Sequence, residues 1–181
     1  MKTKIMMLFA TFVLATVFLP ASLRAQDDKD KHNTVHDASE AKAAFIKTDE
    51  SMKSLFDNSY GYAIFPNVGK AAVVVGGAGG EGTVYEKGKK IGTAKLAQVN
   101  VGAQVGGQAY REVIFFENKD ALDRFTGNKV EFSGQVSAVA AKAGASANAQ
   151  YREGVKVFTQ EIGGLMLEAS IGGQKFTFKP L

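Results

Sequence analysis

The apolar residues of this chain follow two periods, helical before residue 60 and strand-like after it. From Asp37 to Phe56 they recur at spacings of three and four residues, which predicts an amphipathic helix. Asp37 and Glu40 form a capping box at its start. The apolar face of this helix could bind a membrane surface or a partner, or it could pack on a sheet. We favour packing, because the acidic residues of this segment outnumber its lysines, and an anionic membrane attracts the opposite balance.

After residue 60 apolar and polar residues alternate, which predicts strands. Gly61 to Phe65 is expected to be a short strand that ends at Pro66, because proline lacks the donor that a strand ladder needs. Asn118 to Phe125 returns to helical spacing, with Asn118 as the cap. The other expected strands cover residues 71–75, 83–86, 91–97, 98–116 (one strand, or two with a bend at Gly106-Gly107), 130–139, 155–159, 165–171 and 175–179, with a loop at 140–150.

These elements predict an α+β fold. We expect an antiparallel, strongly bent β-sheet that could close into a barrel, with an N-terminal amphipathic helix and a short second helix. Most of the glycine lies between Tyr60 and Gln108. Because glycine lets a strand bend or lie close against another backbone, we expect a bend at residues 76–82. The glycines to which we assign a structural role are Gly76, Gly77, Gly80, Gly82, Gly102 and Gly106.

The N-terminus has the pattern of a secretory signal peptide. Lys2 and Lys4 precede an apolar run, and small residues follow it up to Ala25. We expect residues 1–25 to be cleaved after about Ala25, residues 26–36 to be a flexible leader, and residues 37–181 to form one domain. An uncleaved anchor is the alternative, although the run is short for a membrane span. The mature protein is then exported, to the periplasm or outside the cell.

Charge and cysteine content exclude several classes of function. Removing the signal with Lys2, Lys4 and Arg24 lowers the formal charge from +4 to +1. Nucleic-acid binding thereby loses its electrostatic basis, since such domains carry a concentrated basic surface. The chain has no cysteine, which excludes disulfides, thiolate metal sites, cysteine nucleophiles and the lipid-bearing cysteine of a lipoprotein.

The residues that could carry chemistry do not form a convincing active site. Gly77, Gly79 and Gly82 fit the dinucleotide pattern G-x-G-x-x-G, but a strand-like segment follows them where a helix must begin. The only histidines are His32 and His36 in the leader, and we interpret them as solvated rather than as metal ligands. A paired-carboxylate hydrolase would need Glu112 and Glu117 to converge, and we interpret both as surface acids. We therefore expect no enzyme activity, no cofactor and no metal.

A lysine-rich hairpin is the candidate ligand-binding feature. Its lysines could attract phosphate or anionic headgroups, at roughly 1 kcal/mol per lysine near a charged membrane. They could equally form a solvated hairpin tip. The candidate lipid-binding residues are Lys70, Lys87, Lys89, Lys90 and Lys95.

Three ordered blocks resemble the lipid-binding SYLF domain family. They are Gly61-Tyr62-Ala63-Ile64-Phe65-Pro66-Asn67-Val68-Gly69-Lys70, then Val74-Val75-Gly76-Gly77 with Gly80 and Gly82, then Gly102-Ala103-Gln104-Val105-Gly106-Gly107-Gln108. Gly163-Gly164-Leu165 is similar to the family's closing strand. The resemblance implies a compact α+β domain that binds membrane lipids and, in some members, actin, with no enzyme activity.

Two departures limit what the resemblance implies. Lipid binding in eukaryotic members is associated with a basic first helix, whereas the helix here is slightly acidic, and residues 140–150 match no block. Phosphoinositide specificity and actin binding are therefore not carried over. The leading hypothesis is a non-enzymatic, exported lipid-binding module of the cell envelope that contacts anionic phospholipid. The alternative is a structural or assembly protein that binds an envelope protein partner through a sheet edge.

Overall fold

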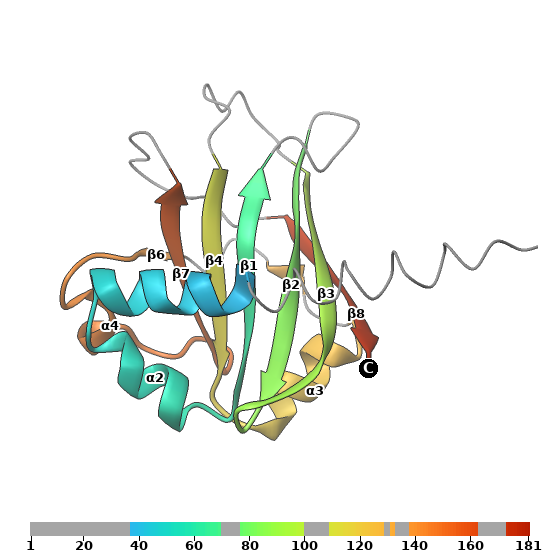
Figure 1. Cartoon of the computed structure of the whole chain (residues 1–181). Coiled ribbons are helices and arrows are strands. Elements are labelled where there is room, and N and C mark those ends of the chain that lie inside the picture. Colours follow the sequence, from blue (N-terminus) through green and yellow to red (C-terminus); the bar gives the residue numbers. More distant parts are fainter. Residues whose placement is uncertain (1–36, 70–76, 100–108, 129–130, 133–137, 163–172) are drawn as a thin grey trace, which may run out of the picture.

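The computed structural model describes residues 37–69, 77–99, 109–128, 131–132, 138–162 and 173–181 (Figure 1). Their strands are β1 (Gly61–Gly69), β2 (Gly77–Glu86), β3 (Lys89–Val99), β4 (Ala109–Phe116), β5 (Glu131–Phe132), β6 (Val139–Ala140), β7 (Val155–Ile162) and β8 (Gln174–Pro180). They form one sheet in the order β5-β8-β3-β2-β1-β4-β7-β6. All neighbours are antiparallel except β6 and β7. The predicted α+β class and mostly antiparallel sheet are confirmed. Because the order ends at β5 and β6, the described strands do not close into a barrel.

The predicted helix from Asp37 to Phe56 is two helices in the structure. The first covers residues 37–48 and α2 covers Met52–Asn58. The carboxylate of Asp49, buried at the break, accepts hydrogen bonds from Ser51 N at 3.1 Å and Ser51 Oγ at 2.5 Å. It also accepts from Ser146 N at 2.8 Å, in α4 (Ala145–Asn148). Burial opposes ionisation, but these donors prevail and lower the pKa of Asp49 to about 2.

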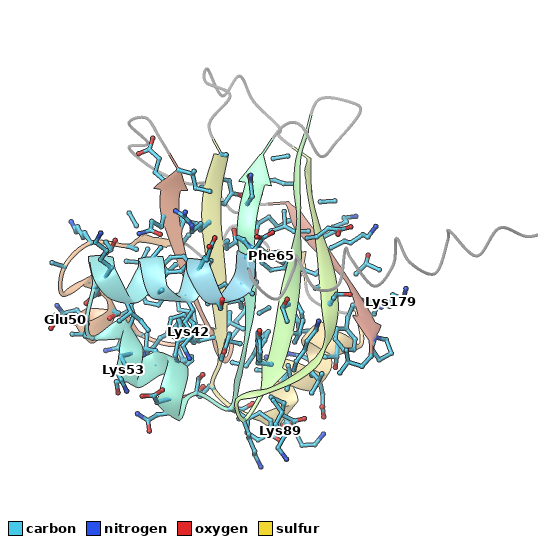
Figure 2. The ribbon with its side chains drawn as sticks, in the orientation of Figure 1. Lys42, Glu50, Lys53, Phe65, Lys89 and Lys179 are labelled. Atoms are coloured by element: carbon cyan, nitrogen blue, oxygen red, sulfur yellow. The ribbon has the colours of Figure 1, made fainter. Side chains whose placement is uncertain are left out.

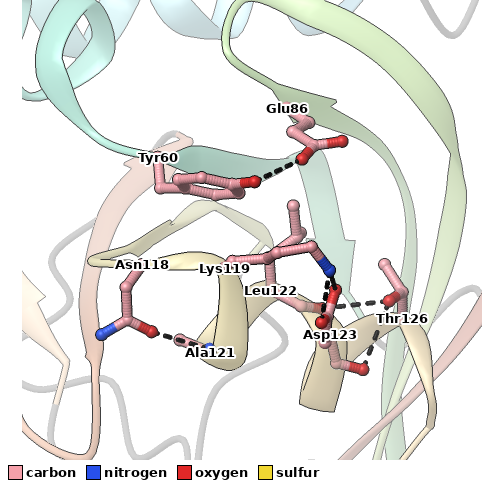
Figure 3. Close-up of polar contacts among 8 residues, drawn as sticks. All are labelled: Tyr60, Glu86, Asn118, Lys119, Ala121, Leu122, Asp123 and Thr126. Atoms are coloured by element: carbon pink, nitrogen blue, oxygen red, sulfur yellow. Dashed lines mark hydrogen bonds and ion pairs between the residues drawn. The ribbon is translucent and has the colours of Figure 1, made fainter.

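The second helix follows the prediction closely. It is α3 (Lys119–Thr126), and the side chain of Asn118 accepts from Ala121 N at 3.0 Å as its N-cap (Figure 3). Lys119 forms an ion pair with Asp123 at 2.6 Å, one turn further on. Ala121, Leu122 and Phe125 are buried, so the predicted apolar face packs inward.

The sheet has an apolar core on each of its faces. The face that we call the outer face carries Tyr62, Ile64 and Phe115, and the first helix and α2 pack on it (Figure 1). The inner face carries Phe65 and Ile114 and is covered by α3. The first helix contributes Ala38, Ala41 and Phe45 to the outer core. Its apolar face therefore packs on the sheet, as we expected.

The sheet curves toward its inner face. Ring centroids of Phe65 on β1 and Phe176 on β8 lie 5.8 Å apart, and Gln174 on β8 donates to Glu112 on β4 at 2.9 Å. Three strands separate β8 from β4. Flat neighbouring strands lie about 4.8 Å apart, so a flat sheet would hold β4 and β8 about 19 Å apart. Side-chain contact between these strands therefore requires curvature.

Several predicted boundaries are wrong. Pro66 does not end its strand: β1 continues to Gly69, and its register shifts around Pro66 against both β2 and β4. A bulge tolerates proline because the ladder is already interrupted there. The described part of the expected bend at 76–82, Gly77 to Gly82, lies inside β2 and pairs with β3, and the bend itself stays a prediction. The expected strand 98–116 is not one strand, because its described ends belong to β3 and β4, which are not neighbours.

Candidate functional site

The hairpin between β2 and β3 carries four of the five predicted lysines, while Lys70 lies outside the described residues. Lys87, with φ of 48°, and Gly88, with φ of 77°, form its turn. Lys89 and Lys90 begin β3 rather than extending the turn, and Figure 2 labels Lys89 at this end of the sheet. Lys95 lies further along β3 and is exposed. The four lysines therefore follow one hairpin but do not form a single cluster.

Strand β8 adds two lysines that we had not predicted as site residues. Lys95 pairs with Thr177, so it stands between Lys175 and Lys179 of the neighbouring strand. Lys175 and Lys179 are exposed and alternate with the inward Gln174 and Phe176, so they share the outer face with Lys95. Figure 2 shows Lys179 near the C-terminal end of β8. We call the set Lys95, Lys175 and Lys179 the lysine face.

The lysine face lies on the part of the outer face beyond the helices. The first helix and α2 pack with residues of β1, β4 and β7. The sheet continues past β1 through β2 to β3 and β8 (Figure 1). Lys179 lies four positions after Lys175 on β8, a span of about 13 Å at roughly 3.3 Å per residue. Three ammonium groups therefore stand over an area that several phosphate groups could occupy.

Acidic neighbours moderate this charge without cancelling it. Lys95 Nζ lies 3.0 Å from Glu81 Oε1, but both side chains are more than 60% exposed, so water competes for the pair. Lys175 stands opposite Glu131 of β5. At the hairpin tip Lys87 Nζ lies 5.0 Å from the ring centroid of Tyr60. The exposed ion pair between Lys95 and Glu81 contributes little to stability, so an approaching phosphate can replace Glu81 as the partner of Lys95.

Glu112 is not a surface acid, and that interpretation is wrong. It is fully buried on the inner face of β4, where burial raises its pKa to about 8 against the opposing effect of a hydrogen bond from Gln174. Glu117 lies beyond the end of β4, exposed. The structure therefore does not bring the two carboxylates together. The alternation of Tyr110, Glu112 and Ile114 on one face was the signal that could have placed Glu112 inside.

A separate pocket of about 490 Å³ lies beside the start of α3. It is lined by Glu117, Asn118, Asp120, Arg124, Glu153 and Gly154. Arg124 already donates to the backbone oxygen of Glu153 at 2.6 Å. Three carboxylates with one engaged guanidinium make this pocket unsuitable for an anionic headgroup.

The glycines of β2 allow two backbones to lie close together. A Cβ at position 80 would lie 2.6 Å from Asn67 O, and one at position 82 would lie 2.5 Å from Ile64 O. Both oxygens belong to β1, the antiparallel neighbour. Gly77, Gly79 and Gly82 thus lie in a paired strand followed by more strand, which does not fit a phosphate-binding loop. Gly76, Gly102 and Gly106 lie outside the described residues.

The described part of the chain shows neither a metal-binding cluster nor a membrane-spanning helix. No group of three or more histidine, aspartate or glutamate residues there is arranged to hold a metal ion. No helix in those ranges is long and apolar enough to cross a membrane. His32 and His36 lie outside them.

Comparison with known proteins adds an independent finding. The sequence model of the Ysc84 family, described as "Las17-binding protein actin regulator", matches residues 97–179. Beta cell expansion factor A of Aeromonas veronii is 33% identical over 126 residues, which are 70% of this chain and 48% of that protein. The chain thus spans about half the length of this curated relative. These matches show that the chain belongs to the SYLF (Ysc84) domain family.

Proposed function

We propose that this chain is a non-enzymatic binding module of the cell envelope that contacts anionic phospholipid surfaces after export. The SYLF family is a family of binding domains, which supports a binding role. The observation that carries the proposal is the lysine face, where Lys95, Lys175 and Lys179 point away from the inner core. Lys87 and Lys89 add exposed positive charge at the hairpin tip.

The chemistry of lysine suits a lipid surface. Each ammonium is a compact charge on a flexible stem, so it can meet phosphates whose positions vary, as they do in a bilayer. Each lysine near an anionic surface contributes about 1 kcal/mol. Three lysines then supply about 3 kcal/mol, which corresponds to roughly a hundredfold in affinity.

Replacing all three lysines of the lysine face with glutamine is expected to lower the affinity for anionic vesicles by roughly a hundredfold. The measurement is sedimentation with vesicles that contain phosphatidylglycerol and with pure phosphatidylcholine vesicles, at low and high salt. Salt should weaken the binding of the unaltered protein because it screens exposed charges.

A matched control removes the same charge elsewhere. Lys47, Lys53 and Lys142 are exposed and lie on the first helix, on α2 and before α4. Their triple glutamine variant should retain most of the binding. Equal losses in both variants would show that net charge, and not the lysine face, determines binding. If the unaltered protein sediments with neither vesicle type at low salt, the lipid proposal is wrong.

A protein partner at a sheet edge is the second candidate. In the described residues β6 is short and pairs with β7 only at Phe158 and Thr159. On this side of β7, the parts of the strand before and after these two residues have no neighbouring strand among the described residues. The family model is described by a protein partner and by actin regulation, which favours testing this candidate. Crosslinking in envelope extracts and co-sedimentation with actin filaments would reveal such a partner. A strict monomer that captures nothing in either assay would exclude this candidate.

A further inference from the structure

A buried polar cluster on the inner face joins the neighbouring strands β3 and β8 to β4, which is distant from both in the sheet. Gln174 Nε2 on β8 donates to Glu112 Oε2 on β4 at 2.9 Å and to Tyr110 Oη at 3.2 Å. Tyr110 Oη in turn donates to Gln98 Oε1 on β3 at 3.1 Å. Both amide hydrogens of Gln174 are therefore used. Glu112 and Gln174 are each fully buried.

Two oxygens of this cluster lack a hydrogen-bond donor. They are Glu112 Oε1 and Gln174 Oε1, which have no partner within the described part of the chain. A buried acceptor without a donor costs about 1–3 kcal/mol, and more if it is charged. The unpartnered atoms belong to the same two side chains that already share the 2.9 Å bond. One hydrogen placed between them would satisfy both.

Among the described residues, the neighbours of Glu112 in the sheet offer no cation in place of that hydrogen. In register with it stand Phe65 on β1 and Thr159 on β7, and Tyr110 lies on the same face of its own strand. None of these groups, and no part of Gln174, is positively charged. An ionised Glu112 would be an uncompensated buried charge, which proteins avoid by neutralising the group.

We propose that Glu112 holds a proton on Oε1 and donates it to Gln174 Oε1, so that two hydrogen bonds lock β8 against β4 across the inner face. A neutral carboxylic acid is both donor and acceptor, and a primary amide is its complement. We call this pair the proton lock. Burial raises the pKa of Glu112 from its ordinary value of 4.5 to about 8, which agrees with a proton held at neutral pH.

The proton lock makes stability depend on pH in a defined window. Between pH 4.5 and 8 the folded chain holds a proton that the unfolded chain releases. The contribution of Glu112 is therefore complete below pH 4.5 and is lost as the pH rises through 8. The unfolding constant should rise by roughly tenfold per pH unit inside this window, the slope for one linked proton.

Glu112→Gln tests the proton lock directly. The amide of glutamine keeps the shape and donates to Gln174 Oε1 at every pH, so this variant should be at least as stable as the unaltered protein at pH 7. Its urea-denaturation midpoint, compared with that of the unaltered protein from pH 5 to pH 9, should lack the one-proton slope. An infrared band from a protonated carboxyl group should be present in the unaltered protein at pH 7 and absent from the variant.

Two results would overturn the proton lock. One is a Glu112→Gln variant with the same pH slope as the unaltered protein. The other is a variant clearly less stable at pH 7, which would show that the native carboxyl group is ionised and paired with a donor or cation. The infrared measurement on the unaltered protein decides the protonation state even if the variant fails to fold.

The proton lock also bears on the lysine face, a step that rests on the proposed function. Lys175 follows Gln174 on β8, so freeing Gln174 from Glu112 loosens the strand that carries two of the three lysines. Vesicle binding should weaken from pH 7 to pH 9 in the unaltered protein and change less in Glu112→Gln. A pH-dependent stability with pH-independent vesicle binding would contradict this step while leaving the lock itself supported.

Discussion

Gly82→Val is expected to destabilise the protein by more than about 3 kcal/mol, because it forces a side chain into the backbone of β1. A Cβ at this position would lie 2.5 Å from Ile64 O and 2.6 Å from Cδ1 of Phe65, and valine adds two methyl groups beyond it. β1 cannot retreat, since it is held by β4 on its other edge. Urea denaturation followed by far-ultraviolet circular dichroism measures the loss.

Gly69→Ala is the matched control within the same strand pair. A Cβ there meets nothing closer than 3.6 Å, which is ordinary contact. Alanine in a compatible backbone conformation stabilises by about 0.4–1 kcal/mol, because it restricts the unfolded chain. Equal stability of Gly82→Val and Gly69→Ala would mean that β1 and β2 are not as close as described. A well-folded Gly82→Val that has lost vesicle binding would instead make this glycine part of the site.

Elements whose signals are local could be predicted from the sequence. The cap of α3 needs only Asn118 and the backbone of Ala121, three residues away. At the turn of Lys87 and Gly88 both residues have positive φ, and Gly88, which adopts such a conformation readily, is the local signal. Such signals do not depend on where the rest of the chain lies. The local structure that they predict is therefore the one found in the folded protein.

The helix break at Asp49 could not be predicted in this way. The apolar spacing of three and four continues across it, and the donor that completes it is Ser146 N, 97 residues along the chain. The continuation of β1 past Pro66 is similar, because only pairing with β2 and β4 reveals the bulge. In both cases a long-range contact overrides a local preference.

The sequence predicted only part of the candidate site, because the rest depends on contacts between residues that are distant in the sequence. Lys95 was found because it lies in the lysine-rich hairpin. Lys175 and Lys179 were missed because their place beside Lys95 depends on the register of β8 against β3, two strands about 80 residues apart in the sequence. Glu112 was misplaced on the surface, although its own strand alternates, because a carboxyl group is rarely buried without a partner.

Phe115→Ala is expected to cost about 3–5 kcal/mol, the usual range for a buried phenylalanine. Phe115 is fully buried on the outer face, with its ring centroid 4.8 Å from that of Phe56 on α2 and 6.0 Å from that of Phe158 on β7. Removing it leaves a cavity where the helices meet the sheet. Since a domain of this size is typically stable by about 5–15 kcal/mol, the variant should retain only part of its stability.

The companion variant Phe115→Leu separates the loss of stability caused by the cavity from the loss caused by the missing aromatic contacts. Leucine fills more of the space, so its cost should stay well below that of alanine. If both variants lose the same stability, the edge-to-face contacts with Phe56 and Phe158 matter more than volume. If neither loses more than about 1 kcal/mol, the helices do not depend on this core. Because the lysine face lies on β3 and β8, vesicle binding by whatever fraction of Phe115→Ala remains folded should be unchanged.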